Sequence, residues 1–144
     1  MKHLRARRPV VLLAALALLL FYDHSGFYRI SLAACLLHEG GHVLVWMFQR
    51  RRFPVLRFSL CGICMEWDGA FVTPAQELWL AAAGPLANFA VCCAVYGMMQ
   101  WRASYFGYFF ASANLWVGLF NLLPFGALDG RRIVSVLLRS YRVR

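Results

Sequence analysis

The chain has 144 residues, of which 62% are hydrophobic and only 15% are charged, and its mean hydropathy is +0.60. Soluble globular domains are usually about 45–50% apolar, so this composition excludes an ordinary soluble protein and is typical of a membrane protein. The net charge of +9 would suit a nucleic-acid binder, but the distribution of that charge argues otherwise. The length suits one domain, and we expect residues 1–144 to form a single membrane-embedded unit.

Four apolar segments are predicted to cross the bilayer, because a hydrocarbon core of about 30 Å needs about 20 apolar helical residues. The first, residues 9–22, is short and needs flanking residues or thinned lipid in order to span. A cleaved secretory signal is the alternative, but no small-x-small cleavage site follows, so a retained anchor over 1–26 is favoured. The other three segments are residues 27–48, 78–100 and 103–123.

Thirteen of the fifteen basic residues fall on one side of this predicted arrangement, leaving only Arg29 and Arg102 for the other side. The basic residues precede the first span, follow the second and follow the fourth. The positive-inside rule then predicts a multi-pass integral membrane protein with both termini in the cytoplasm. The basic residues therefore indicate how the chain is oriented in the membrane. We expect the lipid bilayer to be a partner of this protein and expect no binding of nucleic acid.

The loop between the second and third spans, residues 49–76, changes its hydrophobic period. In "FPVLRFSLCGICMEW", apolar Leu56, Phe58 and Leu60 alternate with polar residues, which predicts a short β-hairpin near the interface; an irregular loop is the alternative. Cys61 and Cys64 have the spacing of a redox or zinc pair, but no second pair accompanies them. We favour small residues at a glycine turn, and the five cysteines predict no disulfide framework.

The segment "NLLPFGALDG" after the fourth span contains Pro124, Gly126 and Gly130, which should break the helix. Unpaired backbone cannot face lipid, so this break should line an enclosed or watery cavity. From Asp129 a last helix is predicted to lie along the interface. The predicted fold class is an all-α polytopic membrane protein with about four transmembrane helices, a small interfacial β-hairpin and a C-terminal interfacial helix.

The sequence "HEGGH" at residues 38–42 fits the pattern H-E-x-x-H. In a helix, His38 and His42 project from one face one turn apart, where two imidazoles can bind one metal ion. Glu39 lies about 100° around the helix, where it can address a water without being a ligand. The alternative is a hydrogen-bonded polar pair inside a bundle, with the two glycines serving close packing. Three ionisable groups in five residues of a span favour the metal site.

A catalytic zinc site needs a third protein ligand. A further histidine of the H-E-x-x-H-x-x-G-x-x-H type is absent, because Val45 and Phe48 occupy the required positions. Apart from Glu39, the chain has five acidic residues, and four of them lie in predicted loops: Asp23, Glu66, Asp68 and Glu77. Asp129, at the end of a span, is the remaining candidate. A helix N-cap is the ordinary alternative role for Asp129. Beside the histidine pair, we favour Asp129 as the third metal ligand.

Three motifs of the chain resemble, in order and spacing, the signatures of the site-2 protease family of intramembrane zinc metalloproteases. They are "HEGGH" at 38–42, "AAGPLANF" at 82–89 and "NLLPFGALDG" at 121–130, and the resemblance covers roughly residues 31–134. It implies that His38, His42 and Asp129 bind one zinc ion and that Glu39 is the catalytic acid and base. Gly84 and Asn88 match a central G-x-x-x-N element, which implies that Asn88 lies near the substrate or the developing oxyanion. Asn121 matches the residue that opens the last motif.

The chain looks similar to the compact branch of this family that includes the sporulation pro-sigma-factor processing peptidases, which implies a bacterial cell membrane. The expected core is about 27–134. The expected function is an intramembrane zinc endopeptidase that cuts a membrane-embedded or membrane-associated protein near the cytoplasmic face. A regulatory membrane partner or a homo-oligomer is a further expectation. The alternative function is a non-hydrolytic membrane module that binds or transports a metal or binds a partner.

Overall fold

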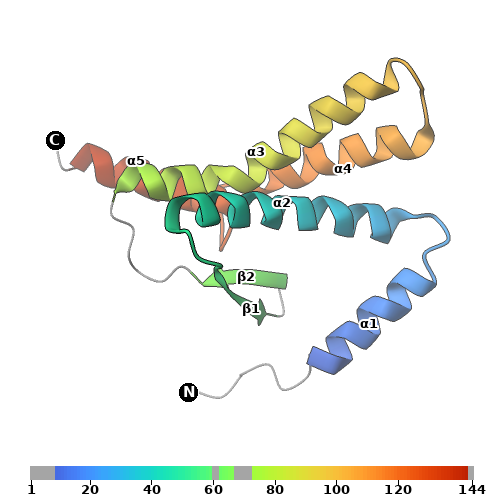
Figure 1. The fold of residues 1–144 in the computed structure, drawn as a ribbon, viewed down its shortest axis with the longest axis horizontal. Helices are drawn as coiled ribbons and strands as arrows, with labels where there is room; N and C mark the ends of the chain where they lie inside the picture. Colours follow the sequence, from blue (N-terminus) through green and yellow to red (C-terminus); the bar gives the residue numbers. More distant parts are fainter. Residues whose placement is uncertain (1–8, 60–61, 67–72, 143–144) are drawn as a thin grey trace.

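The computed structural model describes residues 9–59, 62–66 and 73–142. Figure 1 shows the elements in chain order: α1 (Pro9–Phe21), α2 (Phe27–Arg50), β1 (Val55–Ser59), β2 (Gly62–Glu66), α3 (Pro74–Met99), α4 (Tyr105–Asn121) and α5 (Asp129–Arg142). The helix α3 packs against α2, α4 and α5, whereas α1 stands apart and touches α2 only lightly. The bundle is therefore built around α3.

The predicted fold class needs a correction in its number of transmembrane helices. Within the described residues, two helices are long and apolar enough to cross a membrane, α2 with 24 residues and α3 with 26, so the prediction of about four is wrong. The helix α1 has 13 residues and α4 has 17, which correspond to lengths of about 20 and 26 Å. The side-chain oxygen of Ser104 accepts from the N–H of Gly107 and starts α4 at Tyr105, and the helix ends before Pro124. These limits make α4 shorter than the apolar segment 103–123.

The segment that was expected to form a hairpin contains two five-residue strands. The strands β1 and β2 pair antiparallel, with Val55 opposite Glu66 and Ser59 opposite Gly62. Arg51 ends α2 with a positive φ of 55°, and its N–H donates to the carbonyl of Met47, so the chain turns away from the helix axis toward β1. Residues 60–61 lie outside the described residues, as do the side chains of the strands, so the predicted role of Cys61 and Cys64 stays a prediction.

Close contact between α2 and α3 depends on Gly41. A Cβ at this position would lie 2.6 Å from the carbonyl oxygen of Ala83 and 2.8 Å from the Cβ of Ala87, so only glycine allows this approach. Pro85 lies inside α3 and cannot donate a helical hydrogen bond, and α3 changes direction near its middle in Figure 1. The face of α2 that carries His38 and His42 is thereby pressed against α3.

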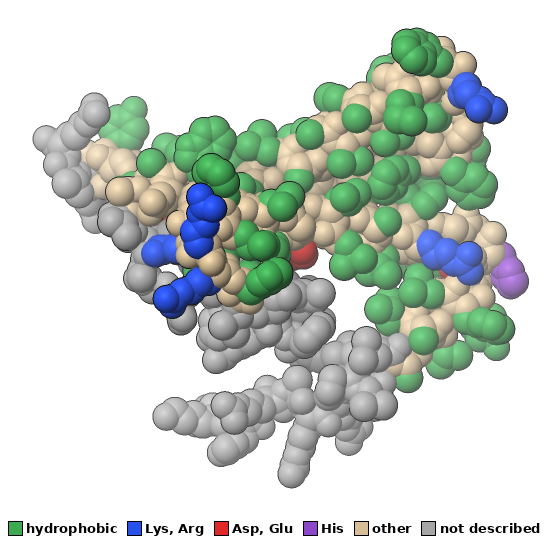
Figure 2. Space-filling view, in the orientation of Figure 1, with side chains coloured by type: hydrophobic (Ala, Val, Ile, Leu, Met, Phe, Trp, Pro, Cys, Tyr) green, Lys and Arg blue, Asp and Glu red, His purple; other side chains and the backbone are tan. Residues whose placement is uncertain are grey.

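The described chain exposes apolar side chains and buries several polar ones in its interior. Figure 2 shows hydrophobic side chains distributed along the helices on the face in view, and large residues such as Leu44, Phe48 and Trp116 are more than two-thirds exposed. The buried polar side chains include two histidines, two asparagines and an aspartate: His38, His42, Asn88, Asn114 and Asp129. This arrangement suits a lipid surrounding, in which ionisable groups face the interior of a bundle.

Candidate metal centre

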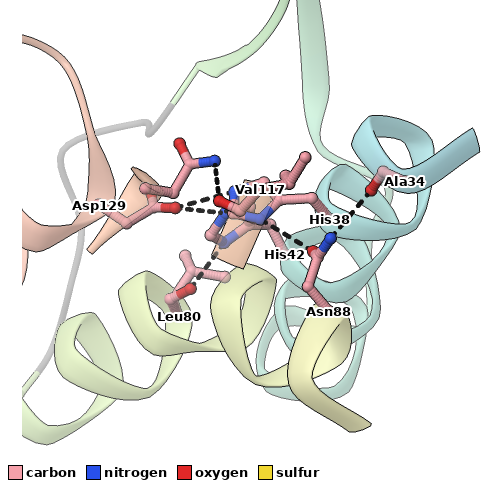
Figure 3. Close-up of polar contacts among 8 residues, drawn as sticks. Ala34, His38, His42, Leu80, Asn88, Val117 and Asp129 are labelled. Carbon is pink, nitrogen blue, oxygen red and sulfur yellow. Dashed lines mark hydrogen bonds and ion pairs between the residues drawn. The ribbon is translucent and has the colours of Figure 1, made fainter. Parts of the chain in front are cut away.

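Three buried side chains from two helices meet at one point of the bundle. His38 and His42 lie on α2, Asp129 is the first residue of α5, and each is at most 9% exposed. The Oδ2 atom of Asp129 lies 3.0 Å from Nε2 of His38 and 3.2 Å from Nε2 of His42, and the two Nε2 atoms are 3.3 Å apart. The structure thus brings the three predicted ligands together (Figure 3).

The other nitrogen of each ring defines the tautomer. Nδ1 of His42 lies 2.8 Å from the backbone carbonyl of Leu80, which can only accept, so this nitrogen carries the proton. Nδ1 of His38 lies 3.1 Å from Oδ1 of Asn88. The amide of Asn88 is itself oriented, because its Nδ2 donates to the carbonyl of Ala34 at 3.1 Å. Both rings are therefore Nδ1–H tautomers, and their Nε2 lone pairs are directed at Asp129.

Three lone-pair atoms at 3.0–3.3 Å from one another repel unless a cation lies between them. A single proton can join only one pair of these atoms, and protonation of both rings would bury two positive charges beside one carboxylate. A metal ion satisfies all three atoms at once. Because imidazole and carboxylate are zinc ligands, the donor set fits zinc.

The spacing of the atoms and the space beside them also fit a metal ion. Ligand atoms about 2.0–2.2 Å from zinc at tetrahedral angles lie about 3.3–3.6 Å from one another, close to the separations found here. Gly84 of α3 lies beside the two rings. A Cβ at this position would collide with Nε2 of His42 and lie 2.7 Å from Nε2 of His38. The predicted G-x-x-x-N element therefore has a physical reason, since Gly84 keeps the metal-facing atoms free.

Replacing Gly84 by Ala should weaken zinc binding about tenfold or more, because the added methyl must push aside the histidines, and such overpacking costs about 1–3 kcal/mol. Isothermal titration of the purified metal-free protein in detergent would measure this change. Gly97→Ala is the matched control on the same helix, since a Cβ there meets no atom within 4 Å. Equal zinc affinity in the two variants would contradict the inferred position of the metal.

The carboxylate of Asp129 faces the histidines rather than its own helix. Within the described chain it accepts no hydrogen bond from the first turn of α5, so the structure gives no sign of the alternative capping role. Burial alone would raise the pKa of Asp129, whereas a proton on Nε2 of His38 or His42 lowers it through a hydrogen bond and a positive charge. A metal ion in place of that proton would favour the same ionised carboxylate, which is the form that binds a metal.

The two predicted catalytic residues lie beside this centre. Glu39 follows His38 on α2, is half-buried, and has no hydrogen-bond partner among the described residues. Asn88 of α3 is fully buried, and both of its N–H groups are engaged, one with Ala34 and one with Oδ1 of Asn114 at 3.2 Å. In this arrangement Asn88 has no free donor for a substrate, and its observed contact is with His38.

Sequence reasoning missed two groups that support the site. One is the backbone carbonyl of Leu80, which no side-chain pattern could reveal. The other is Asn114 of α4, which is fully buried against Asn88. A polar residue in the apolar run "ASANLWVGLF" was the available signal, because polar groups inside a membrane are rare and usually functional.

Two of three comparisons with known proteins found a match. A family model for Peptidase family M50 matches residues 97–144, which contain Asp129 but not the HEGGH motif. The solved structure of a site-2 protease from Methanocaldococcus jannaschii matches 91% of this chain with a TM-score of 0.65 and 22% sequence identity, which shows a shared fold. The chain spans 64% of the length of that structure. A search of curated proteins found no match.

Proposed function

The family model and the structural match support the assignment of this chain to the site-2 protease family, and on that premise we propose that it is an intramembrane zinc endopeptidase. We propose that it hydrolyses a peptide bond of a membrane-embedded or membrane-associated protein near the cytoplasmic face. The observation that carries this proposal is the convergence of His38, His42 and Asp129 inside an apolar bundle, next to Glu39.

The described side chains divide the chemistry among themselves. We propose that His38, His42 and Asp129 hold one zinc ion per chain. When bound, zinc supplies a Lewis acid that polarises a carbonyl and lowers the pKa of water from 15.7 toward about 7. The Glu39 carboxylate takes the proton from the attacking water and gives it to the nitrogen of the leaving amine, so the proton balance closes. The apolar surroundings strengthen each of these electrostatic interactions.

A substrate helix must unwind before cleavage, because its carbonyls are hidden in hydrogen bonds. The strands β1 and β2 pair with each other, and within the described residues neither outer edge has a partner. We propose that an unwound substrate segment adds to one of these edges as a further strand, which would keep its backbone extended.

Charge supports a cytoplasmic location for the end of the bundle that contains the site. Arg50 and Arg51 end α2, and α5 carries Arg131, Arg132 and Arg139. Arg139 pairs with Glu77 in the first turn of α3 at 3.1 Å, and Gln49 near the end of α2 donates to the carbonyl of Gln76 at 3.3 Å, so these basic segments lie at the same end. We propose that this end faces the cytoplasm of a bacterial cell. Residues 1–8 lie outside the described residues, and the cytoplasmic side of both termini stays a prediction.

A regulatory membrane partner or a homo-oligomer also stays a prediction. The alternative of a non-hydrolytic metal-binding or metal-transport module is less favoured. Such a module would need the three ligands but not an ionisable carboxyl beside them in an apolar helix, where a charge is costly.

Metal removal tests the proposal directly. The purified protein, reconstituted with a panel of single-span membrane proteins, should cleave at least one of them, and chelation should lower the rate at least about 100-fold. Readdition of zinc should restore cleavage, because zinc would supply the Lewis acidity on which the proposed hydrolysis depends. Mass spectrometry of the products would place the cut relative to the membrane. Cleavage that is insensitive to chelation would contradict a zinc peptidase.

A further inference from the structure

Asn114 of α4 ends a chain of hydrogen bonds that leads to the metal centre. Its Nδ2 donates to the carbonyl of Phe110 at 2.9 Å, and its Oδ1 accepts from Nδ2 of Asn88 at 3.2 Å. Oδ1 of Asn88 in turn accepts from Nδ1 of His38 at 3.1 Å. Both asparagines are completely buried, and this chain of contacts joins α4, α3 and α2.

The orientation of the Asn88 amide decides which tautomer His38 adopts. With Oδ1 toward the ring, Nδ1 of His38 must carry the proton, and the Nε2 lone pair is left for the metal. A flipped amide would direct an N–H at Nδ1 and favour the tautomer with the proton on Nε2, which cannot bind a metal there. The flip would also set Oδ1 of Asn88 against two other acceptors, the carbonyl of Ala34 and Oδ1 of Asn114.

The orientation of Asn114 is defined in the same way. Its N–H donates to the Phe110 carbonyl of its own helix, one turn earlier, so its Oδ1 is presented to Asn88. Removing this acceptor takes away one of the two groups that resist the amide flip. It also leaves one buried N–H of Asn88 without a partner, and an unsatisfied buried donor is unfavourable.

We propose that Asn114 is a positioning residue of the metal centre. It holds the Asn88 amide in the orientation that keeps the proton of His38 on Nδ1 and its Nε2 free for zinc. This inference rests on the proposed metal centre but is independent of the substrate and of the cleavage step. A role limited to tying helices together would not predict any coupling between Asn114 and the state of the His38 ring.

Zinc affinity in a double-mutant cycle tests this role. Asn114→Leu should weaken zinc binding about tenfold, and Asn88→Leu about 10–100-fold, the usual range for partners of metal ligands. In the Asn88→Leu background, adding Asn114→Leu should change the affinity by less than about twofold, because Asn114 acts through Asn88. An equal loss in both backgrounds, or no loss in either, would overturn the proposal.

Conservative and control variants separate positioning from folding. Asn114→Asp keeps an acceptor for Asn88, and its protonated form can still donate to Phe110, so its affinity should stay within about threefold of the parent. Affinity as weak as that of Asn114→Leu would count against the proposal. If the Leu variant does not fold, Asn114→Ala provides the same comparison. Ser112→Leu changes an exposed polar residue of α4 and should have no effect.

The ring itself gives a readout that needs no zinc. ¹⁵N spectra of histidine-labelled, metal-free protein should show a proton on Nδ1 of His38 in the parent, whatever the state of Nε2, and a mixture of protonated and unprotonated Nδ1 in Asn114→Leu. An unchanged tautomer in the variant would refute the positioning role. If the parent protein binds no zinc, the proposed metal centre fails, and these spectra still decide whether Asn114 controls His38.

Discussion

Replacing Glu39 by Gln should lower cleavage of a susceptible membrane protein by about 10²–10⁴-fold, the usual contribution of a general acid and base. The amide has the size of the carboxyl but cannot take a proton from water. Zinc content should not change, because Glu39 is not one of the three groups whose ligand atoms converge. Co-expression with single-span substrates, followed by rates and metal analysis of the purified variant, would measure both effects.

Glu77→Gln is the matched control for this substitution. Glu77 is also a partly buried helical glutamate, but it lies in the first turn of α3 and pairs with the exposed Arg139 rather than facing the metal centre. Its cleavage rate should therefore stay within about fivefold of the parent. Substrate cleavage at the parental rate in Glu39→Gln would contradict the proposed proton transfer. A lower rate accompanied by loss of zinc would show that Glu39 is needed for metal binding.

The second large effect is expected at Asp129. Asp129→Ala should weaken zinc binding by more than about 100-fold and abolish cleavage, because the loss of a ligand should exceed the 10–100-fold cost of losing a ligand's outer partner. The variant leaves His38 and His42 with no anionic third ligand. Zinc titration and metal content of the purified protein would measure the change.

Asp129→Asn distinguishes the ligand role from the capping role. Asparagine caps helices about as well as aspartate, but it lacks the negative charge that Asp129 presents to the two histidines. We expect Asp129→Asn to lose zinc nearly as severely as Asp129→Ala while it retains the α5 helix in circular dichroism. Normal zinc content in Asp129→Asn would contradict the ligand role and would favour Asp129 as the N-cap of α5.

The meeting of HEGGH with Asp129 could be anticipated from the sequence for a simple reason. Helical spacing places His38 and His42 on one face, and a chain with only six acidic residues leaves few choices for a third ligand. The helix break before Asp129 could also be predicted from the sequence, because Pro124 and two glycines disfavour a continuous helix. Local rules therefore carried the prediction as far as the identity of the converging side chains.

The helix lengths and the supporting contacts could not be predicted in the same way. The length of an apolar segment gives only an upper limit to the length of the helix within it. In α4 the cap at Ser104 and the end at Asn121 set the actual length, so the number of transmembrane helices was overestimated. The contacts of Leu80 and Asn114 depend on how α3 and α4 pack against α2. Packing of this kind follows from the tertiary structure, as does the closeness of Gly84 to both rings.

The order in which the chain is synthesised gives the position of Asp129 a further meaning. His42 precedes Asp129 by 87 residues, and synthesis at about 5–20 residues per second separates the two by roughly 4–17 s. During that interval the membrane contains the histidine pair without its third ligand, while α3 and α4 are still being made. The proposed peptidase would therefore be unable to attack neighbouring membrane proteins while it is itself being inserted, because its metal centre is complete only after the bundle around it has been produced.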